Sequence, residues 1–187
     1  SSDLEAALAL IAPVEEAIKT LMGLDCYGTD EDSLASVVGN LLRRRSQTLG
    51  VAESCTGGGV GHLVTTVAGS SAYFRGGIIA YDNQVKTGLL QVDATVLDRV
   101  GAVSEEVASQ MAIGVQAILQ TDWALSVTGI AGPTGGTAEK PVGLVYIGLA
   151  NPDRQASSFR YDFSGFRGRR SEEHTSELQS QFRISYA

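Results

Sequence analysis

Cysteine is scarce in this 187-residue sequence, which contains only Cys26 and Cys55. Two cysteines are too few for a disulfide framework or a cysteine-rich zinc site, and they favour a reducing, cytoplasmic setting. No uncharged apolar run reaches about 18 residues, so we expect no transmembrane helix and no membrane partner. The first residues also lack the charged, apolar and small-residue succession that is typical of a signal peptide.

Basic residues are outnumbered, because 14 lysines and arginines face 21 aspartates and glutamates and leave a formal net charge of −7. An acidic chain is poorly suited to broad electrostatic binding of nucleic acid, so we expect no direct nucleic-acid partner. A small anionic ligand at a local site is compatible with this charge. The HExxH, CxxC and EF-hand patterns are absent, and the sequence therefore predicts no metal and no cofactor.

Glycine is abundant, with 22 copies, and many glycines stand at the ends of apolar runs. Apolar runs predict strands over residues 48–54, 76–81, 123–129, 142–150 and 157–163. Helical spacing and capping residues predict helices over residues 3–22, 29–45, 57–69, 83–90 and 104–120. Thr29 or Asp30 is the expected N-cap of the second helix. Strands that alternate with helices and end in a hairpin indicate a layered α/β domain with a mixed sheet.

Two predicted strands end in polar, glycine-rich loops, ESCTGG at residues 53–58 and TGIAGP at residues 128–133. In open α/β sheets, ligands bind beyond the carboxyl ends of parallel strands. The first loop leads into a helix, whose free N–H groups attract a phosphate or a developing oxyanion. Neither loop matches a nucleotide-binding fingerprint. The alternative interpretation is that the glycines only permit tight turns.

Lys86 stands in the first turn of a predicted helix, behind the expected N-cap Asn83. A cation there opposes the helix dipole, and burial would lower its pKa, so that a partly neutral lysine can act as a general base. The alternative is a lysine whose stem carries the charge into water. His62 lies in the middle of a predicted helix, which leaves a Ser–Lys pair as the metal-free way to activate a hydroxyl. Cys55 at a helix start is a further candidate, as a thiolate of low pKa.

Four collinear blocks of the sequence resemble the CinA C-terminal domain family, whose stand-alone members are nicotinamide-nucleotide amidases. They are AESCTGG at residues 52–58 and the longer blocks at residues 68–86, 101–108 and 126–148. The resemblance implies a three-layer α/β/α fold with a mixed, mostly parallel sheet, over a domain of residues 29–169. Residues 1–28 look like a remnant of the linker before this domain in full-length CinA, which implies an N-terminal CinA domain as a further partner. Residues 170–187, which begin RSEEHTSELQS, resemble a translated sequencing adapter, and we expect an artefactual tail there.

The same resemblance implies hydrolysis of the carboxamide of nicotinamide mononucleotide to nicotinate mononucleotide and ammonia, by a Ser/Lys mechanism in a homodimer. Carried onto this sequence, Lys86 is the base, Tyr81 is the adjacent hydroxyl, and Ser71 and Ser54 compete as the nucleophile, with Ser71 preferred. The expected substrate-binding residues are Glu53, Thr56, Gly57, Gly58, Asn83, Thr128, Gly129 and Gly132. The alternative is a non-catalytic module that binds nucleotides or proteins in the competence or DNA-damage response.

Overall fold

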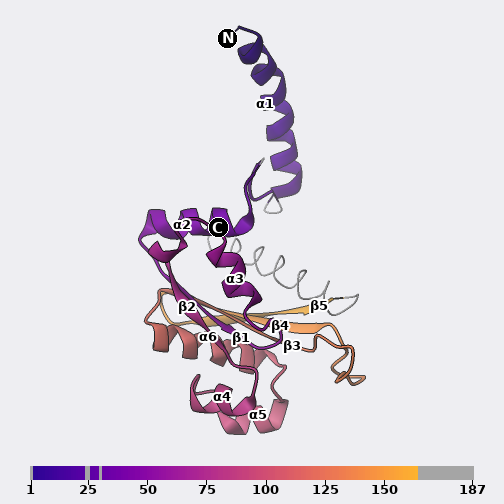
Figure 1. Ribbon diagram of the computed structural model, residues 1–187. Coiled ribbons are helices and arrows are strands. Elements are labelled where there is room, and N and C mark those ends of the chain that lie inside the picture. Colours follow the sequence, from indigo (N-terminus) through magenta and orange to yellow (C-terminus); the bar gives the residue numbers. More distant parts are fainter. Residues whose placement is uncertain (1, 24–25, 30, 164–187) are drawn as a thin grey trace.

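The computed structural model describes residues 2–23, 26–29 and 31–163 (Figure 1). The expectation for residues 170–187 lies outside the described residues. The helices are α1 (Ser2–Met22), α2 (Leu34–Arg45), α3 (Gly59–Thr65), the 3₁₀ turn η2 (Ser70–Ala72), α4 (Asn83–Gly88), α5 (Ala94–Val100) and α6 (Glu105–Leu119). The strands are β1 (Leu49–Glu53), β2 (Phe74–Ile79), β3 (Trp123–Gly129), β4 (Leu144–Ala150) and β5 (Ala156–Asp162).

The described strands form one five-stranded sheet in the order β2-β1-β3-β4-β5. Strand β1 pairs in parallel with both β2 and β3, whereas β3–β4 and β4–β5 are antiparallel pairs. Four of the five strands therefore point the same way and β4 opposes them. The predicted mixed, mostly parallel sheet with a terminal hairpin is confirmed.

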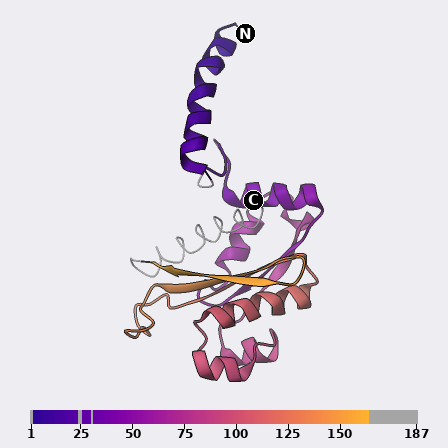
Figure 2. The same ribbon diagram turned by 180° about the vertical axis from the view of Figure 1, so that it is seen from behind.

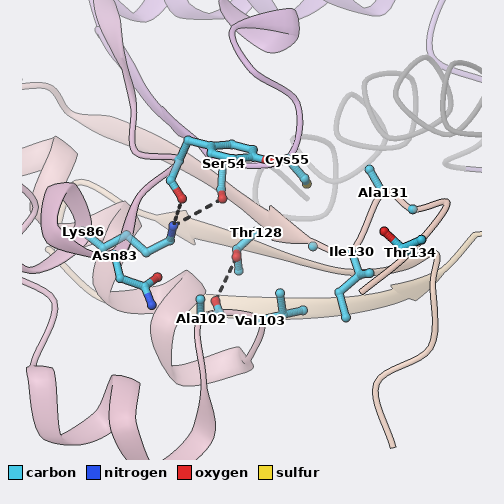
Figure 3. A pocket seen from close by; sticks show the side chains of 13 residues that line it. Ser54, Cys55, Asn83, Lys86, Ala102, Val103, Thr128, Ile130, Ala131 and Thr134 are labelled. Carbon is cyan, nitrogen blue, oxygen red and sulfur yellow. Dashed lines mark hydrogen bonds between the residues drawn. The ribbon is translucent and has the colours of Figure 1, made fainter. Parts of the chain in front are cut away.

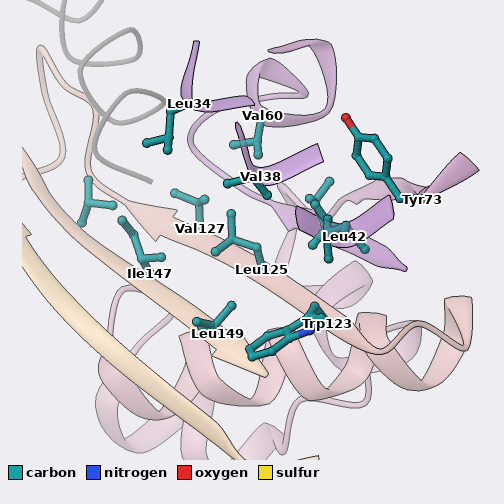
Figure 4. Close-up of a cluster of buried hydrophobic side chains, with 13 residues drawn as sticks. Leu34, Val38, Leu42, Val60, Tyr73, Trp123, Leu125, Val127, Ile147 and Leu149 are labelled. Carbon is teal, nitrogen blue, oxygen red and sulfur yellow. The ribbon is translucent and has the colours of Figure 1, made fainter. Parts of the chain in front are cut away.

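Helices cover both faces of this sheet, so the three-layer α/β/α architecture is confirmed as well (Figures 1 and 2). On one face, Leu42 of α2 and Val60 of α3 pack with Val51 of β1 and Leu125 of β3 (Figure 4). Helices α4, α5 and α6 lie on the other face, where Ala52 of β1 belongs to a second buried cluster built around α6. Neighbouring residues of β1 thus serve opposite cores, as the alternation of side chains along a strand requires.

Small residues allow α6 to approach the sheet closely. A Cβ atom on Gly148 would lie 2.4 Å from the Ala108 carbonyl oxygen of α6. The same oxygen accepts a hydrogen bond of 2.5 Å from the Ser126 hydroxyl of β3. Within α6 itself, a Cβ atom on Gly114 would lie 2.0 Å from the Leu90 carbonyl oxygen. A larger side chain at either glycine would collide with backbone atoms, so the small residues are needed for this close approach. The approach fixes the position of α6 and, with it, the course of the loop before the helix.

The N-caps of two helices, α2 and α4, differ from the sequence-based expectation. Helix α2 starts at Leu34, and its N-cap is Ser33, which forms a capping box with Ser36. The expectation of a cap at Thr29 was wrong because Thr29 closes a separate turn, in which its N–H donates to the Asp32 carboxylate. The alternative cap, Asp30, lies outside the described residues.

The N-cap of α4 is Asp82, whose carboxylate accepts from the Gln84 N–H at 2.7 Å. The expected cap, Asn83, is instead the first residue of this helix. The N-cap of α6 is Ser104, the residue at which this helix was predicted to begin. Helix α5, capped by Asp93, was not expected from the sequence.

Helix α1 projects away from the layered body in both views (Figures 1 and 2). Its apolar side chains, Leu4, Leu8, Leu10, Ile11, Val14, Ile18 and Leu21, are exposed. Among the described residues, we find no helix that combines the length and apolarity needed to cross a membrane.

Replacing Gly114 by alanine tests the close packing of α6. We expect Gly114→Ala to lower the free energy of unfolding by about 1–3 kcal/mol, because the new Cβ collides with backbone. Gly88→Ala is the matched control, since nothing in the described part of the chain lies within 4 Å of its added Cβ. Urea denaturation of both variants measures the difference. Equal stability of Gly114→Ala and the unchanged protein would contradict this packing.

Candidate active site

A cavity of about 310 Å³ opens at the carboxyl ends of β1, β2 and β3 (Figure 3). Four segments line it: the loop after β1, the turn into α4, the loop before α6 and the loop after β3. The lining residues are Ser54, Cys55, Tyr81, Asn83, Lys86, Ala102, Val103, Thr128, Gly129, Ile130, Ala131, Gly132 and Thr134. This is the edge of the sheet where parallel α/β folds bind their ligands.

Lys86 is buried at the inner end of this cavity, with only 1% of its surface exposed. Its Nζ donates to the carbonyl oxygens of Ala80 at 2.7 Å and Tyr81 at 3.0 Å, and it lies 3.3 Å from the Ser54 hydroxyl (Figure 3). Burial lowers the pKa of Lys86, although the nearby carboxylate of Asp82 acts in the opposite direction. The structure therefore excludes the alternative in which this side chain carries its charge into water.

Local geometry explains why Lys86 turns inward. The end of β2 is attached to the end of β1, because the Ala80 N–H donates to the Glu53 carbonyl oxygen at 2.7 Å. The chain then turns at Asp82 into α4. Lys86 follows one helical turn later, and its stem runs back towards the carbonyls that precede the helix.

Ser54 is the serine that the fold brings to Lys86. It is buried, and its N–H donates to the Val127 carbonyl oxygen at 2.9 Å, which continues the β1–β3 pairing by one residue. Ser71 lies in η2, immediately before β2, and is exposed. Lys86 follows the other end of β2, and a strand of six residues spans roughly 20 Å. The preference for Ser71 as the partner of Lys86 was therefore wrong.

Glu53 has a structural role that the sequence analysis missed. Its buried carboxylate accepts hydrogen bonds from the N–H groups of Gly58, Val60 and Gly61 at 2.8 to 3.1 Å. The chain's own carboxylate thus occupies the start of α3, where we expected a phosphate or an oxyanion. None of Glu53, Thr56, Gly57 and Gly58 lines the cavity, so their assignment to substrate binding is corrected.

The backbone conformations of the two glycines in this loop support the alternative interpretation, in which the glycines permit a tight turn. Gly57 and Gly58 adopt φ angles of 59° and 104°, a region that side-chain-bearing residues rarely enter. Thr56 also points inward, and its buried Oγ1 has no hydrogen-bond partner among the described residues. Thr56, Gly57 and Gly58 therefore build the base of the site instead of contacting a ligand.

The other predicted binding residues do line the cavity. The Thr128 hydroxyl is buried and donates to the Ala102 carbonyl oxygen at 2.8 Å, so it holds the cavity wall. Gly129 is required for packing, because a Cβ there would lie 2.8 Å from the Leu144 carbonyl oxygen. Asn83 is exposed and lies beside Lys86 (Figure 3). Tyr81 is 67% exposed.

Cys55 lines the cavity next to Ser54, but burial raises the pKa of its thiol to about 12. The thiol is therefore protonated at neutral pH, and the hypothesis of a reactive thiolate is corrected. His62 is exposed on α3 and does not line the cavity. Within residues 2–23, 26–29 and 31–163, no group of three or more His, Cys, Asp or Glu side chains is placed to hold a metal ion.

Sequence reasoning missed Ala102, Val103 and Thr134 as cavity residues. Their side chains carry no acid, base or metal ligand, so no chemical signal marks Ala102 or Val103. The one available signal was the block at residues 101–108, which resembles a family motif.

Comparisons of the chain with known proteins all point to the same family. The model of the CinA C-terminal domain family matches residues 31–180, and so runs past the expected domain end at residue 169. A CinA-like protein of Trichormus variabilis is 63% identical over 164 residues, which make up 88% of this chain and 39% of that protein. A CinA-like protein of Cyanothece sp. is 63% identical over 87% of this chain and 39% of its own length. The chain thus spans about two-fifths of the length of these relatives.

Solved structures show the same fold. A CinA superfamily protein of Klebsiella pneumoniae superposes with a TM-score of 0.77 at 28% identity, covering 81% of this chain and 94% of that one. A competence/damage-inducible protein of Agrobacterium tumefaciens superposes with a TM-score of 0.74 at 30% identity, covering 83% of this chain and 97% of that one.

Removing the charge of Glu53 tests its structural role. We expect Glu53→Gln to lower the free energy of unfolding by about 1.5–3 kcal/mol, because charged hydrogen bonds are lost and an amide NH₂ group meets N–H donors. Glu106→Gln is the matched control, since Glu106 lies in the first turn of α6 but its side chain is 47% exposed. Glu106→Gln should lower the free energy of unfolding by less than about 1 kcal/mol. Urea denaturation measures both, and equal effects would contradict this role for Glu53.

Proposed function

The chain belongs to the CinA C-terminal domain family, and on this premise we propose that it hydrolyses the carboxamide of nicotinamide mononucleotide to nicotinate mononucleotide and ammonia. The supporting observation is the buried Lys86 amine, which lies 3.3 Å from the Ser54 hydroxyl at the inner end of the cavity. A lysine of lowered pKa next to a serine is the arrangement that activates a hydroxyl for covalent catalysis.

The first step of the proposed reaction transfers the Ser54 proton. A neutral amine has two N–H bonds and one lone pair, and the carbonyls of Ala80 and Tyr81 accept both N–H bonds. The lone pair then faces Ser54, whose hydroxyl donates to it. As the Ser54 oxygen bonds to the carboxamide carbon, its proton passes to Lys86. The resulting ammonium keeps its two carbonyl partners and has the attacked centre as its third.

The second step releases ammonia. The tetrahedral intermediate carries a negative oxygen, which we assign to the N–H group of Cys55, a residue that lines the cavity. This group follows Ser54 directly, whereas the N–H groups at the start of α3 already donate to the Glu53 carboxylate. Lys86 returns its proton to the leaving nitrogen, the carbon–nitrogen bond breaks, and an ester on Ser54 remains.

Water completes the cycle. A water molecule attacks the ester carbon and gives its proton to Lys86, which passes it to the departing Ser54 oxygen. The net change is carboxamide plus water to carboxylic acid plus ammonia. In this scheme Tyr81 contributes its backbone carbonyl to Lys86, while the role of its side-chain hydroxyl, which the family resemblance implies, stays a prediction.

Variants of the two serines and of Lys86 test the assignment. We expect Ser54→Ala to release no detectable ammonia from nicotinamide mononucleotide, because the nucleophile is missing. Lys86→Met should reduce kcat about 10²–10⁴-fold through the loss of the general base. Ser71→Ala is the matched control and should keep the normal rate, since Ser71 lies at the opposite end of β2.

Two outcomes would contradict the proposal in different ways. An inactive Ser71→Ala protein beside an active Ser54→Ala protein would reverse the serine assignment. Binding of the mononucleotide by the unchanged protein without ammonia release would favour the non-catalytic module instead.

The rate of hydrolysis should depend on pH through Lys86. Because burial lowers its pKa, the reactive neutral amine forms at a pH below the ordinary lysine value of 10.5. We therefore expect kcat/KM to rise with pH along one ionisation and to level off below pH 10.5. Stopped-time ammonia assays across this range measure the profile. A profile that is flat, or the same in the residual activity of Lys86→Met, would rule out Lys86 as the base.

A further inference from the structure

Three side chains hold every carbonyl oxygen of the loop at residues 100–103, between α5 and α6. The Lys140 ammonium donates to the carbonyl oxygens of both Val100 and Val103, the second at 2.7 Å. The Ser104 hydroxyl donates to Gly101 at 3.0 Å, and the Thr128 hydroxyl donates to Ala102 at 2.8 Å. Ser104 directly follows this loop and Thr128 belongs to β3, whereas Lys140 belongs to a separate loop.

That separate loop, residues 130–143, joins β3 to β4 and forms the facing wall of the cavity. Its first part contributes Ile130, Ala131, Gly132 and Thr134, whereas Ala102 and Val103 contribute the wall on the other side. Lys140 does not line the cavity itself. Its two hydrogen bonds therefore connect the two walls from outside.

The backbone around Lys140 is arranged to present this side chain. The Lys140 N–H donates to the Thr137 hydroxyl at 3.0 Å, and the Thr137 N–H donates to the Lys140 carbonyl oxygen at 2.8 Å. At its base, the loop is closed by the bonds from Ile130 N–H to the Leu144 carbonyl and from Gly143 N–H to the Ile130 carbonyl. Residues 133–139 between these attachments are exposed, so Lys140 provides the outer attachment of the loop.

The catalytic pair stands on other segments. Ser54 follows β1 and Lys86 belongs to α4, and the hydrogen bonds of the Lys86 amine involve neither loop. A change at Lys140 should therefore alter the shape of the cavity without altering the distance between Ser54 and Lys86.

We propose that Lys140 is a positioning residue, which sets the width of the substrate cavity by holding the loop at residues 130–143 against the loop at residues 100–103. The kinetic part of this proposal rests on the proposed amidase function. Lys140 makes the two walls one unit, so that a bound mononucleotide contacts both without first having to order them.

The experiment replaces Lys140 by methionine, which keeps a long apolar stem and removes the donors. We expect KM for nicotinamide mononucleotide to rise about tenfold or more, with kcat within about twofold, because substrate binding is weakened and the chemical step is not. Lys140→Arg should restore most of the loss, since guanidinium also donates to two carbonyls. Lys19→Met is the matched control, because Lys19 lies on α1 and pairs only with Glu15 in the described structure.

Amide hydrogen exchange supplies a readout that needs no activity. In Lys140→Met, exchange should become faster within residues 100–103 and 130–143 and stay unchanged in β1 and α4. If Lys140→Met unfolds the protein, Lys140→Gln, which keeps one donor, takes its place in both measurements. Unchanged exchange in the two loops, or a fall in kcat with constant KM, would overturn the proposal. Faster exchange in a protein that releases no ammonia would support the role of Lys140 and reject the amidase function.

Discussion

The burial of the Lys86 amine is the constraint around which the site is built. An amine taken out of water must be neutral or be surrounded by acceptors, and here two backbone carbonyls at the end of β2 supply the acceptors. Those carbonyls are fixed because β2 pairs in parallel with β1, and the pairing continues through the bond from Ala80 to Glu53. The same pairing brings Ser54, the residue after Glu53, to the amine. The distance between base and hydroxyl is therefore a consequence of sheet register.

Two neighbouring residues at the end of β1 point to opposite sides of the sheet and have different roles. Glu53 turns towards α3 and satisfies the N–H groups at its start, while Ser54 turns towards the cavity. The buried carboxylate anchors the loop that follows, and it removes the start of α3 as a binding site for an external anion. The lining residues include no aspartate, glutamate or arginine, and a neutral Lys86 leaves the inner end of the cavity uncharged, which suits an uncharged group such as a carboxamide.

Close packing of α6 against the sheet positions the rest of the cavity. The small residues Ser126 and Gly148 let α6 lie against the sheet, and the loop before α6 consequently passes the carboxyl end of β3. Thr128 and Lys140 then hold that loop by its carbonyl oxygens. The wall of the cavity is thus made from backbone that side chains of two other segments keep in place.

Local patterns in the sequence were sufficient for much of the fold. The strand at residues 123–129 and the start of the helix at Ser104 were predicted correctly, because alternation, apolar runs and capping side chains act over a few residues. The same local chemistry marked Lys86 as a candidate base. Where several polar side chains precede a helix, local patterns can mislead, because Thr29 or Asp30 was the expected cap of α2 and the observed cap is Ser33.

Which serine meets Lys86 was decided only by the tertiary structure. Ser71 is the nearer of the two along the chain, while Ser54 is 32 residues away, and yet Ser54 is the one in contact. Separation along the sequence is misleading here, because β2 lies between Ser71 and Lys86 and carries the chain from the amino ends of the parallel strands to their carboxyl ends. Parallel pairing then places the end of β1 beside the end of β2. Strand order and register arise from contacts between distant segments, which no local pattern contains.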